Sequence, residues 1–124
     1  MGTIHHHALI VTGWNEGVNE AHAKALELYG EAFADNALYT GKDAQRLVGP
    51  IVASLTNGYR TFVLHPDGSK EWWKTSDEIE AARDNFIEWL RTDGQRLYLD
   101  WVLVGFGELG PQVTTAHEEL AHRE

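Results

Sequence analysis

The spacing of apolar residues changes abruptly within the first third of the chain, and this change limits that part to a strand followed by a helix. From Ile4 to Trp14 the residues alternate between two faces, both apolar in the middle, which is typical of a β-strand covered on both sides. From Val18 to Phe33 the apolar residues follow the helical period, with charged residues opposite. The apolar stripe comprises Val18, Ala21, Ala25, Leu28, Tyr29, Ala32 and Phe33. We therefore expect an amphipathic helix that packs on a sheet.

The dipeptide Asn57–Gly58 lies between two β-rich runs and predicts a tight hairpin. A two-residue type I′ turn needs positive φ at both central positions, which Asn and Gly tolerate best. Such a turn would fix the register by pairing Thr56 with Tyr59 and Ser54 with Thr61. The face that carries these residues would hold hydroxyl groups, and the other face would be largely apolar.

A second turn and a second helix follow. The turn Pro66–Ser69 would return the chain into a strand through Lys70–Trp73. Thr75 and Glu78 have the spacing of a capping box, which predicts a helix from this point to about Arg91. The apolar stripe of that helix comprises Ile79, Ala82, Phe86, Trp89 and Leu90.

The end of the chain predicts one or two further strands. Leu97–Phe106 is strand-like, and Val113–His117 fits either a last strand or the start of a short helix through Leu120. The order is then β-α-β-β-β-α-β-(β). It predicts an α+β fold, with two helices packed on one face of a mostly antiparallel sheet. A chain of 124 residues fits one domain, residues 1–124.

Composition indicates the compartment. Cysteine is absent, so stability must come from packing, as in proteins of reducing compartments. The longest apolar run, Ala8–Val11, is far shorter than the roughly 20 residues that span a bilayer. The N-terminus also lacks the charged start and long apolar stretch of a signal peptide. We expect a cytoplasmic protein.

The charge balance restricts the partners. Ten Lys and Arg residues against 19 Asp and Glu residues give a formal net charge of -9. Like charge repels phosphate backbones and anionic lipid surfaces, so we expect no binding to DNA or RNA duplexes and none to membranes. The acidic surface serves solubility, or it meets a basic patch on a partner protein.

The histidine run at the N-terminus is the first candidate for chemistry. His5 and His7 project from one face of the predicted strand, a spacing that lets two imidazoles share a metal ion. Metal sites need three or four converging ligands, and a third would have to come from His65, Asp100 or His117. Otherwise these histidines form hydrogen bonds or contact a neighbouring subunit at an exposed strand start. A metal-dependent hydrolase that uses His5 and His7 is thus one hypothesis.

The second turn contains polar groups, but their spacing is not that of a known catalytic motif. The turn Asp67–Lys70 offers a backbone concavity, a hydroxyl and an ammonium group that suit an anion, without the spacing of a P-loop. His65, Asp67 and Ser69 are the residue types of a hydrolytic triad, without the strand-turn-helix elbow that presents a nucleophile. The sequence therefore favours a protein that is not an enzyme, and it predicts no cofactor.

Five tryptophans are more than a core of this size is expected to bury. Adjacent tryptophans in a strand point to opposite faces, so one of the pair at positions 72 and 73 must leave the core. A simple loop at the preceding turn puts Trp72 on the face of Tyr59 and Thr61, with Arg60 and Lys74 nearby, whereas a bulge would put Trp73 there instead. Trp72 and its four neighbours predict a surface for a stacked base or sugar, or a subunit interface, and the interface is favoured.

The chain also resembles a group of small proteins of unknown function carried by bacteriophages, prophages and bacteria. The segments that carry this resemblance are Ile4–Trp14, Asn57–Phe62, Pro66–Trp73, Phe86–Leu90 and Leu99–Val102. They cover most of the chain, and the resemblance brings no established activity and no functional residues. It implies a context, because small phage-borne accessory domains often bind host proteins or sequester the nucleotide signals of bacterial immunity.

These observations together predict a non-catalytic binding protein that forms homo-oligomers. It would act in the host cytoplasm as a phage accessory or counter-defence factor. Its ligand would be a nucleotide-derived signal or a basic host protein. The alternatives are the metal-dependent hydrolase and a structural module without a ligand.

Overall fold

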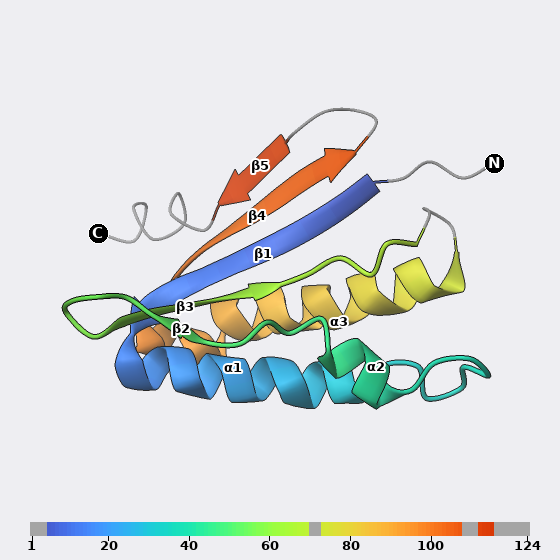
Figure 1. Ribbon diagram of the computed structural model, residues 1–124, viewed down its shortest axis with the longest axis horizontal. Coiled ribbons are helices and arrows are strands. Elements are labelled where there is room, and N and C mark those ends of the chain that lie inside the picture. The colour runs from blue at the N-terminus through green and yellow to red at the C-terminus, as the bar shows by residue number, and fades with distance from the viewer. Residues whose placement is uncertain (1–4, 70–72, 108–111, 116–124) are drawn as a thin grey trace.

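Helices cover one face of a five-stranded antiparallel sheet, which confirms the predicted α+β class (Figure 1). The computed structural model describes residues 5–69, 73–107 and 112–115. The strands are β1 (His5–Trp14), β2 (Val52–Ala53), β3 (Tyr59–Leu64), β4 (Asp100–Gly107) and β5 (Gln112–Thr115). The helices are α1 (Asn15–Gly30), α2 (Gly41–Gln45) and α3 (Lys74–Arg91), and a 3₁₀ helix, η1, spans Asp93–Leu97. The sheet order is β2-β3-β1-β4-β5.

β1 is the central strand because it pairs along most of its length with both β3 and β4. Its side chains alternate as the sequence predicts: Leu9 and Val11 are fully buried beneath the helices, and Ile10 points to the opposite side. That opposite side is also apolar, although the helices of the described residues lie on one face only (Figure 1). The sequence predicts that both faces of β1 are covered. Within the described part of the chain, helices cover one of these faces.

The two long helices bury the predicted stripes. On α1, Val18, Ala21 and Ala25 are fully buried, and Tyr29 is 1% exposed. On α3, the fully buried Phe86 packs against Phe62 of β3, with ring centroids 6.2 Å apart. The apolar periodicity thus correctly placed both helices against the sheet. Among the described helices, none is long and apolar enough to cross a membrane.

The start of α3 differs from the prediction. Trp73 occupies the N-cap position with extended backbone, so the helix begins at Lys74 and Thr75 lies inside its first turn. The capping box predicted at Thr75 and Glu78 is therefore wrong. A capping interaction is found instead at α2, where the Thr40 backbone N–H donates to Oδ2 of Asp43 over 2.8 Å.

Helix α2 lies in a segment, residues 35–46, whose polar and glycine residues are typical of a connection between elements. Its five residues bury only Ala44, so they have no apolar stripe from which a helix could be predicted. The helix is fixed by contacts distant in sequence, since Nε2 of Gln45 donates to the carbonyl of Leu26 on α1 over 2.9 Å.

The hairpin has the predicted residues at its tip but a different register. Asn57 and Gly58 both have positive φ, 63° and 67°. Val52 pairs with Thr61, and the Ser54 N–H donates to the carbonyl of Tyr59 over 2.9 Å. The register is thus two residues from the predicted one. The loop is wider because Oγ of Ser54 donates to backbone carbonyls across it, and a shift of two keeps each side chain on its predicted face.

The strand predicted through Lys70–Trp73 lies mostly outside the described residues. Of that segment only Trp73 is described, and it caps α3 instead of joining the sheet. The argument that placed Trp72 on one sheet face and its neighbour on the other therefore does not apply to Trp73.

Tyr29 gives the fold a measurable pH dependence. Burial raises the pKa of the Tyr29 phenol well above its ordinary value, and the charge of Arg83 acts in the opposite direction. The folded state therefore holds the phenol proton more tightly than the unfolded state. The contribution of Tyr29 to the free energy of unfolding is fully present below about pH 10. It falls as the pH rises further, because unfolding then releases the phenol proton.

We expect alkaline pH to lower the melting temperature of the native chain more than that of a Tyr29→Phe variant, which has no phenol to ionise. The measurement is thermal unfolding between about pH 9 and about pH 11. Tyr98→Phe is the control, because Tyr98 is 80% exposed and its removal should leave the pH dependence unchanged. Equal alkaline losses in the native and Tyr29→Phe chains would contradict the assignment.

Candidate functional site

The structure separates the residues predicted to form the ligand site. Tyr59, Arg60 and Thr61 begin β3, whereas Lys74 begins α3. The start of β3 and the start of α3 lie at opposite ends of the molecule (Figure 1). Trp72 lies outside the described residues. The predicted set therefore contributes to two different surfaces.

At the β3 end, aromatic and hydroxyl side chains meet across the sheet. The Tyr59 ring lies 4.5 Å from the ring of Trp14, which is 54% exposed. The hydroxyls of Thr12 and Thr61 are hydrogen-bonded over 2.9 Å. Arg60 turns to the helix side, where Nη1 donates to Oδ1 of Asn19 over 3.1 Å. The Arg60 guanidinium therefore does not face the rings of Trp14 and Tyr59. These rings and the two threonine hydroxyls form a sheet surface to which Arg60 adds no positive charge.

The histidines give limited support for a metal site. His7 and His65 line one small cavity of about 20 Å³, which has room for about one water molecule. The His5 side chain and His117 lie outside what the structure describes. Asp100 pairs with Thr12, five residues along β1 from His7, or roughly 16 Å, so it is too far to share a metal ion with that histidine. No group of three or more metal-binding side chains occurs among the residues described.

The turn after β3 does not have the geometry of a hydrolytic triad. The Ser69 hydroxyl donates directly to Oδ2 of Asp67, and the Ser69 N–H donates to Oδ1 of the same carboxylate. In a triad the acid orients the histidine, and the histidine contacts the serine. The carboxylate here orders the turn around Gly68, which has a φ of 85°.

A pocket of about 860 Å³ opens beside the start of α3, and we call it the Trp73 pocket. Its wall comes from three parts of the chain: the connection from α1 through α2, the turn after β3, and the first turn of α3. Its aromatic and charged residues are Phe33, Tyr39, Asp43, Arg46, Asp67, Trp73 and Lys74. Of the predicted ligand residues, Lys74 is in this pocket.

Local structure presents the two exposed rings. Oδ1 of Asn36 accepts hydrogen bonds from the backbone N–H groups of Leu38 and Tyr39, over 2.8 and 2.9 Å, and this turn holds the Tyr39 ring beside Phe33. Tyr39 is 45% exposed. Trp73 is 52% exposed at the N-cap of α3. The pocket thus has two accessible aromatic surfaces held by short-range hydrogen bonds and by a helix start.

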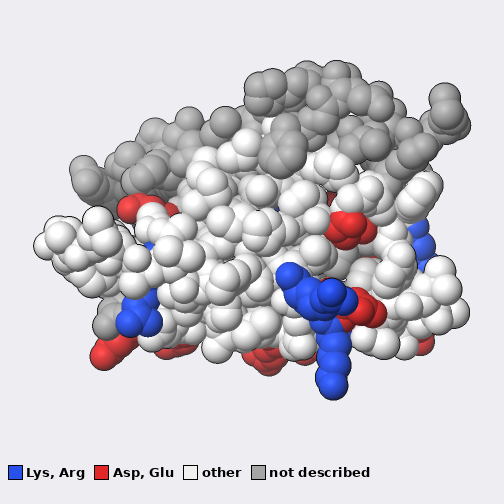
Figure 2. Space-filling view, viewed as in Figure 1, with Lys and Arg blue, Asp and Glu red and all other residues white. Residues whose placement is uncertain are grey.

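The charged groups of the pocket differ in how far neighbouring groups already bind them. Both carboxylates bind neighbouring groups, since Asp43 accepts from the Thr40 N–H and Asp67 accepts from Ser69. Nη1 of Arg46 lies 3.8 Å from Oδ1 of Asp43, and the Arg46 side chain is 82% exposed. Figure 2 shows the basic atoms over α2 beside acidic atoms. Lys74 adds a second cation at the start of an 18-residue helix, whose dipole favours an anion there.

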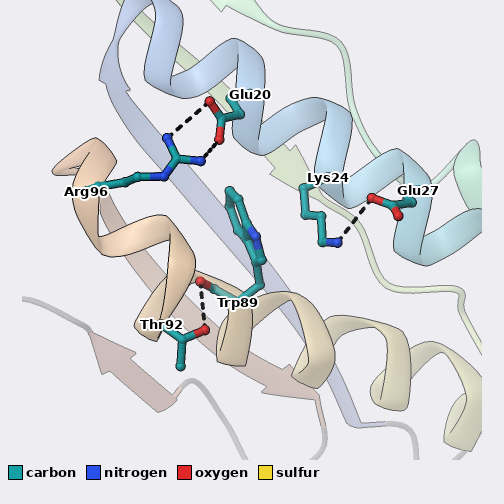
Figure 3. Close-up of polar contacts among 6 residues, drawn as sticks. All are labelled: Glu20, Lys24, Glu27, Trp89, Thr92 and Arg96. Atoms are coloured by element: carbon teal, nitrogen blue, oxygen red, sulfur yellow. Dashed lines mark hydrogen bonds and ion pairs between the residues drawn. The ribbon is translucent and has the colours of Figure 1, made fainter.

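A second hollow, of about 950 Å³, lies between α1 and the segment from Trp89 to Tyr98. Figure 3 shows the Trp89 indole between two ion pairs, Arg96 with Glu20 and Lys24 with Glu27. The hydrogen bond from Arg96 lowers the pKa of Glu20, and the same bond raises the pKa of Arg96. The lining of this hollow carries three carboxylates, Glu20, Glu27 and Asp93, against two cations, Lys24 and Arg96, so it is less suited to an anionic ligand than the Trp73 pocket.

Sequence reasoning missed Tyr39 and Arg46. The spacing of Thr40 and Asp43 is the signal that could have placed α2, since a Thr followed three residues later by an acid marks a helix start. No comparable signal shows that α2 and the start of α3 line the same pocket.

No protein-family model, curated protein or solved structure matches the chain. The resemblance to small phage-borne proteins therefore stays a prediction from the sequence.

Proposed function

We propose that the protein is a non-catalytic binding protein that holds a small, flat, anionic ligand in the Trp73 pocket. One observation carries this proposal. Two half-exposed rings, Trp73 and Tyr39, line one pocket together with two cations, Arg46 and Lys74.

The rings supply the affinity for a flat group. Stacking of a base on an aromatic side chain contributes about 1–3 kcal/mol, and every base has the required π-face. The volume of about 860 Å³ lies within the range of roughly 300–1,000 Å³ that is usual for small-molecule sites. A nucleotide-derived ligand therefore fits the pocket in size and in chemistry.

The cations supply the affinity for phosphate. The net charge of -9 disfavours a long polyanion, because most of the surface would repel it. A ligand with one or two phosphates would meet the local charges of the pocket, where Arg46 and Lys74 are the cations and the carboxylates of Asp43 and Asp67 already accept hydrogen bonds from Thr40 and Ser69. In the phage context that the resemblance implies, such binding would sequester a nucleotide signal of bacterial immunity in the host cytoplasm.

Thermal shift against a panel of cyclic mononucleotides and dinucleotides tests the proposal. A ligand present at 100 times its dissociation constant stabilises the folded state by about 2.7 kcal/mol, which is readily measured. Trp73→Ala should weaken binding of the nucleotide by about tenfold or more, because the stacking surface is lost. Chromatography of the nucleotide after incubation should show it unchanged, which separates binding from hydrolysis.

Trp14→Ala is the matched control, since this indole is 54% exposed against 52% for Trp73 and lies on β1, outside the pocket. It should leave nucleotide binding unchanged. Lys74→Ala should weaken binding of phosphorylated ligands only, with no effect on the free nucleoside. The proposal fails if no nucleotide raises the melting temperature, or if Trp14→Ala weakens binding as much as Trp73→Ala.

The acidic surface favours a second candidate, a basic host protein as partner. With 19 acidic against 10 basic residues, such binding would depend strongly on salt concentration. Association with a basic protein that weakens steeply as salt increases, and that is unaffected by Trp73→Ala, would support this candidate over the nucleotide.

A further inference from the structure

We propose that two copies of this chain pair through the face of the sheet that the helices leave uncovered, which we call the open face. This inference is independent of the ligand in the Trp73 pocket. It starts from the register of the three central strands. Ile10 of β1 pairs with Val63 of β3 and with Val102 of β4, so the three side chains form one apolar row across the sheet.

The open face continues this row in both directions along the strands. Ala8 pairs with Val104, and Trp14 pairs with Tyr59, which places further apolar side chains on the same face. Ile10 is 37% exposed and Val52, at the edge next to Thr61, is 63% exposed. A contiguous apolar surface of this kind on a soluble domain marks a contact surface.

Residues 116–124 have a mainly polar and charged sequence. The longest stretch outside the described residues is 116–124, with the sequence Ala-His-Glu-Glu-Leu-Ala-His-Arg-Glu. Leu120 is its one large aliphatic residue, beside three glutamates and one arginine. Burial of such charges against valine and isoleucine would be costly.

Charge permits a second copy at the open face, although it opposes contact elsewhere on the surface. Two chains that each carry a net charge of -9 repel one another, so they can approach only where carboxylates are sparse. The described side chains on the open face of β1, β3 and β4 are Ala, Ile, Thr, Val, Trp, Tyr and one histidine, with Asp100 as the one carboxylate among them. A basic partner would instead seek the acidic surface elsewhere.

The size of the sheet also fits. Strands about 4.8 Å apart, with a rise of about 3.3 Å per residue, give a face of roughly 500 Å² for a sheet of five strands. A standard interface buries about 800 Å² on each partner, so the open face supplies the greater part of that area. Two such sheets would stack about 10 Å apart around a two-fold axis, with Ile10 near the centre. The helices, and with them both Trp73 pockets, would face outward.

Sedimentation of the full chain over a range of concentrations tests the pairing. We expect the native chain to form dimers and Ile10→Glu to raise the dimer dissociation constant by about 100-fold or more, because the symmetric interface would bring two buried carboxylates together. Leu38→Glu is the matched control. It places the same charge at an aliphatic residue that is 83% exposed in the connection before α2, and it should leave the dimer intact.

Circular dichroism of each variant establishes that it is folded. If Ile10→Glu does not fold, Val52→Glu replaces it, since a side chain that is 63% exposed at the sheet edge tolerates a charge. A native chain that stays monomeric at every concentration would overturn the proposal. So would a dimer that both open-face variants leave as tight as the native one, because the contact would then lie on another surface.

Discussion

Gly41→Ala is expected to destabilise the fold by about 2–3 kcal/mol and to weaken ligand binding in the Trp73 pocket. A Cβ atom at Gly41 would lie 2.0 Å from the carbonyl oxygen of Gly30 and 3.1 Å from its Cα. Both atoms belong to the backbone of α1, so no side chain can rotate away. The end of α1 and the start of α2 would have to separate. Tyr39 precedes α2 in the sequence and Arg46 directly follows it, so both pocket residues would move with that helix.

Urea unfolding measures the first effect, and titration with a nucleotide that binds the native chain measures the second. Gly58→Ala is the control, because Gly58 lies at the hairpin tip with a φ of 67° and a Cβ atom there would have no neighbouring atom within 4 Å. It should cost about 1–2 kcal/mol through backbone strain alone and leave ligand binding unchanged. A Gly41→Ala variant with native stability and native binding would show that the contact between α1 and α2 does not shape the pocket.

The parts of the fold that could be predicted are those in which burial is periodic along the chain. On α1, Val18, Ala21 and Ala25 are fully buried at the spacing expected for one face of a helix. The alternation of Leu9, Ile10 and Val11 likewise gave the strand and its two faces. Such patterns can be read from the sequence because successive side chains on one face of a helix or strand all contact the same neighbouring layer.

The parts that could not be predicted depend on contacts between distant residues. Helix α2 is held to α1 by the hydrogen bond from Gln45 to Leu26 and by the approach of Gly41 to Gly30. The hairpin register depends on Ser54, whose hydroxyl bridges the loop where a two-residue turn was expected. Neither arrangement changes the apolar pattern, so neither can be read from periodicity.

In the candidate site, too, one feature could be predicted from the sequence and another could not. The surplus of tryptophans predicted exposed rings, and Trp14 and Trp73 are both about half exposed. The position of the rings was predicted on the assumption that Trp73 lies in a strand, and it instead caps α3. Lys74 therefore meets Tyr39 and Arg46 in a pocket, far from Tyr59.

The two proposed surfaces are compatible because they lie on different layers. The Trp73 pocket is built from the helix layer and the turn after β3, whereas the open face is the other side of the sheet. Loss of pairing in Ile10→Glu should leave ligand binding per chain unchanged, and Trp73→Ala should leave the dimer intact. Any coupling between the two would have to pass through the core between helices and sheet.

Phe86→Ala is expected to have the largest effect on that core, a loss of about 3–5 kcal/mol in the free energy of unfolding. The Phe86 side chain is fully buried, packs 6.2 Å from Phe62 of β3 and stacks at 5.8 Å on Trp89. Its removal leaves a cavity between α3 and the sheet that neighbouring rings can fill only in part.

Denaturant unfolding followed by circular dichroism measures this loss, and Leu55→Ala is the control, because Leu55 is fully exposed at the hairpin and its truncation should change stability by less than about 0.5 kcal/mol. A domain of this kind has roughly 5–15 kcal/mol in total, so Phe86→Ala removes a large share of its stability. A cost below about 1.5 kcal/mol would mean that α3 does not pack on β3 through this ring. Since α3 carries Trp73 and Lys74 at its first turn, the placement of the pocket depends on the same packing.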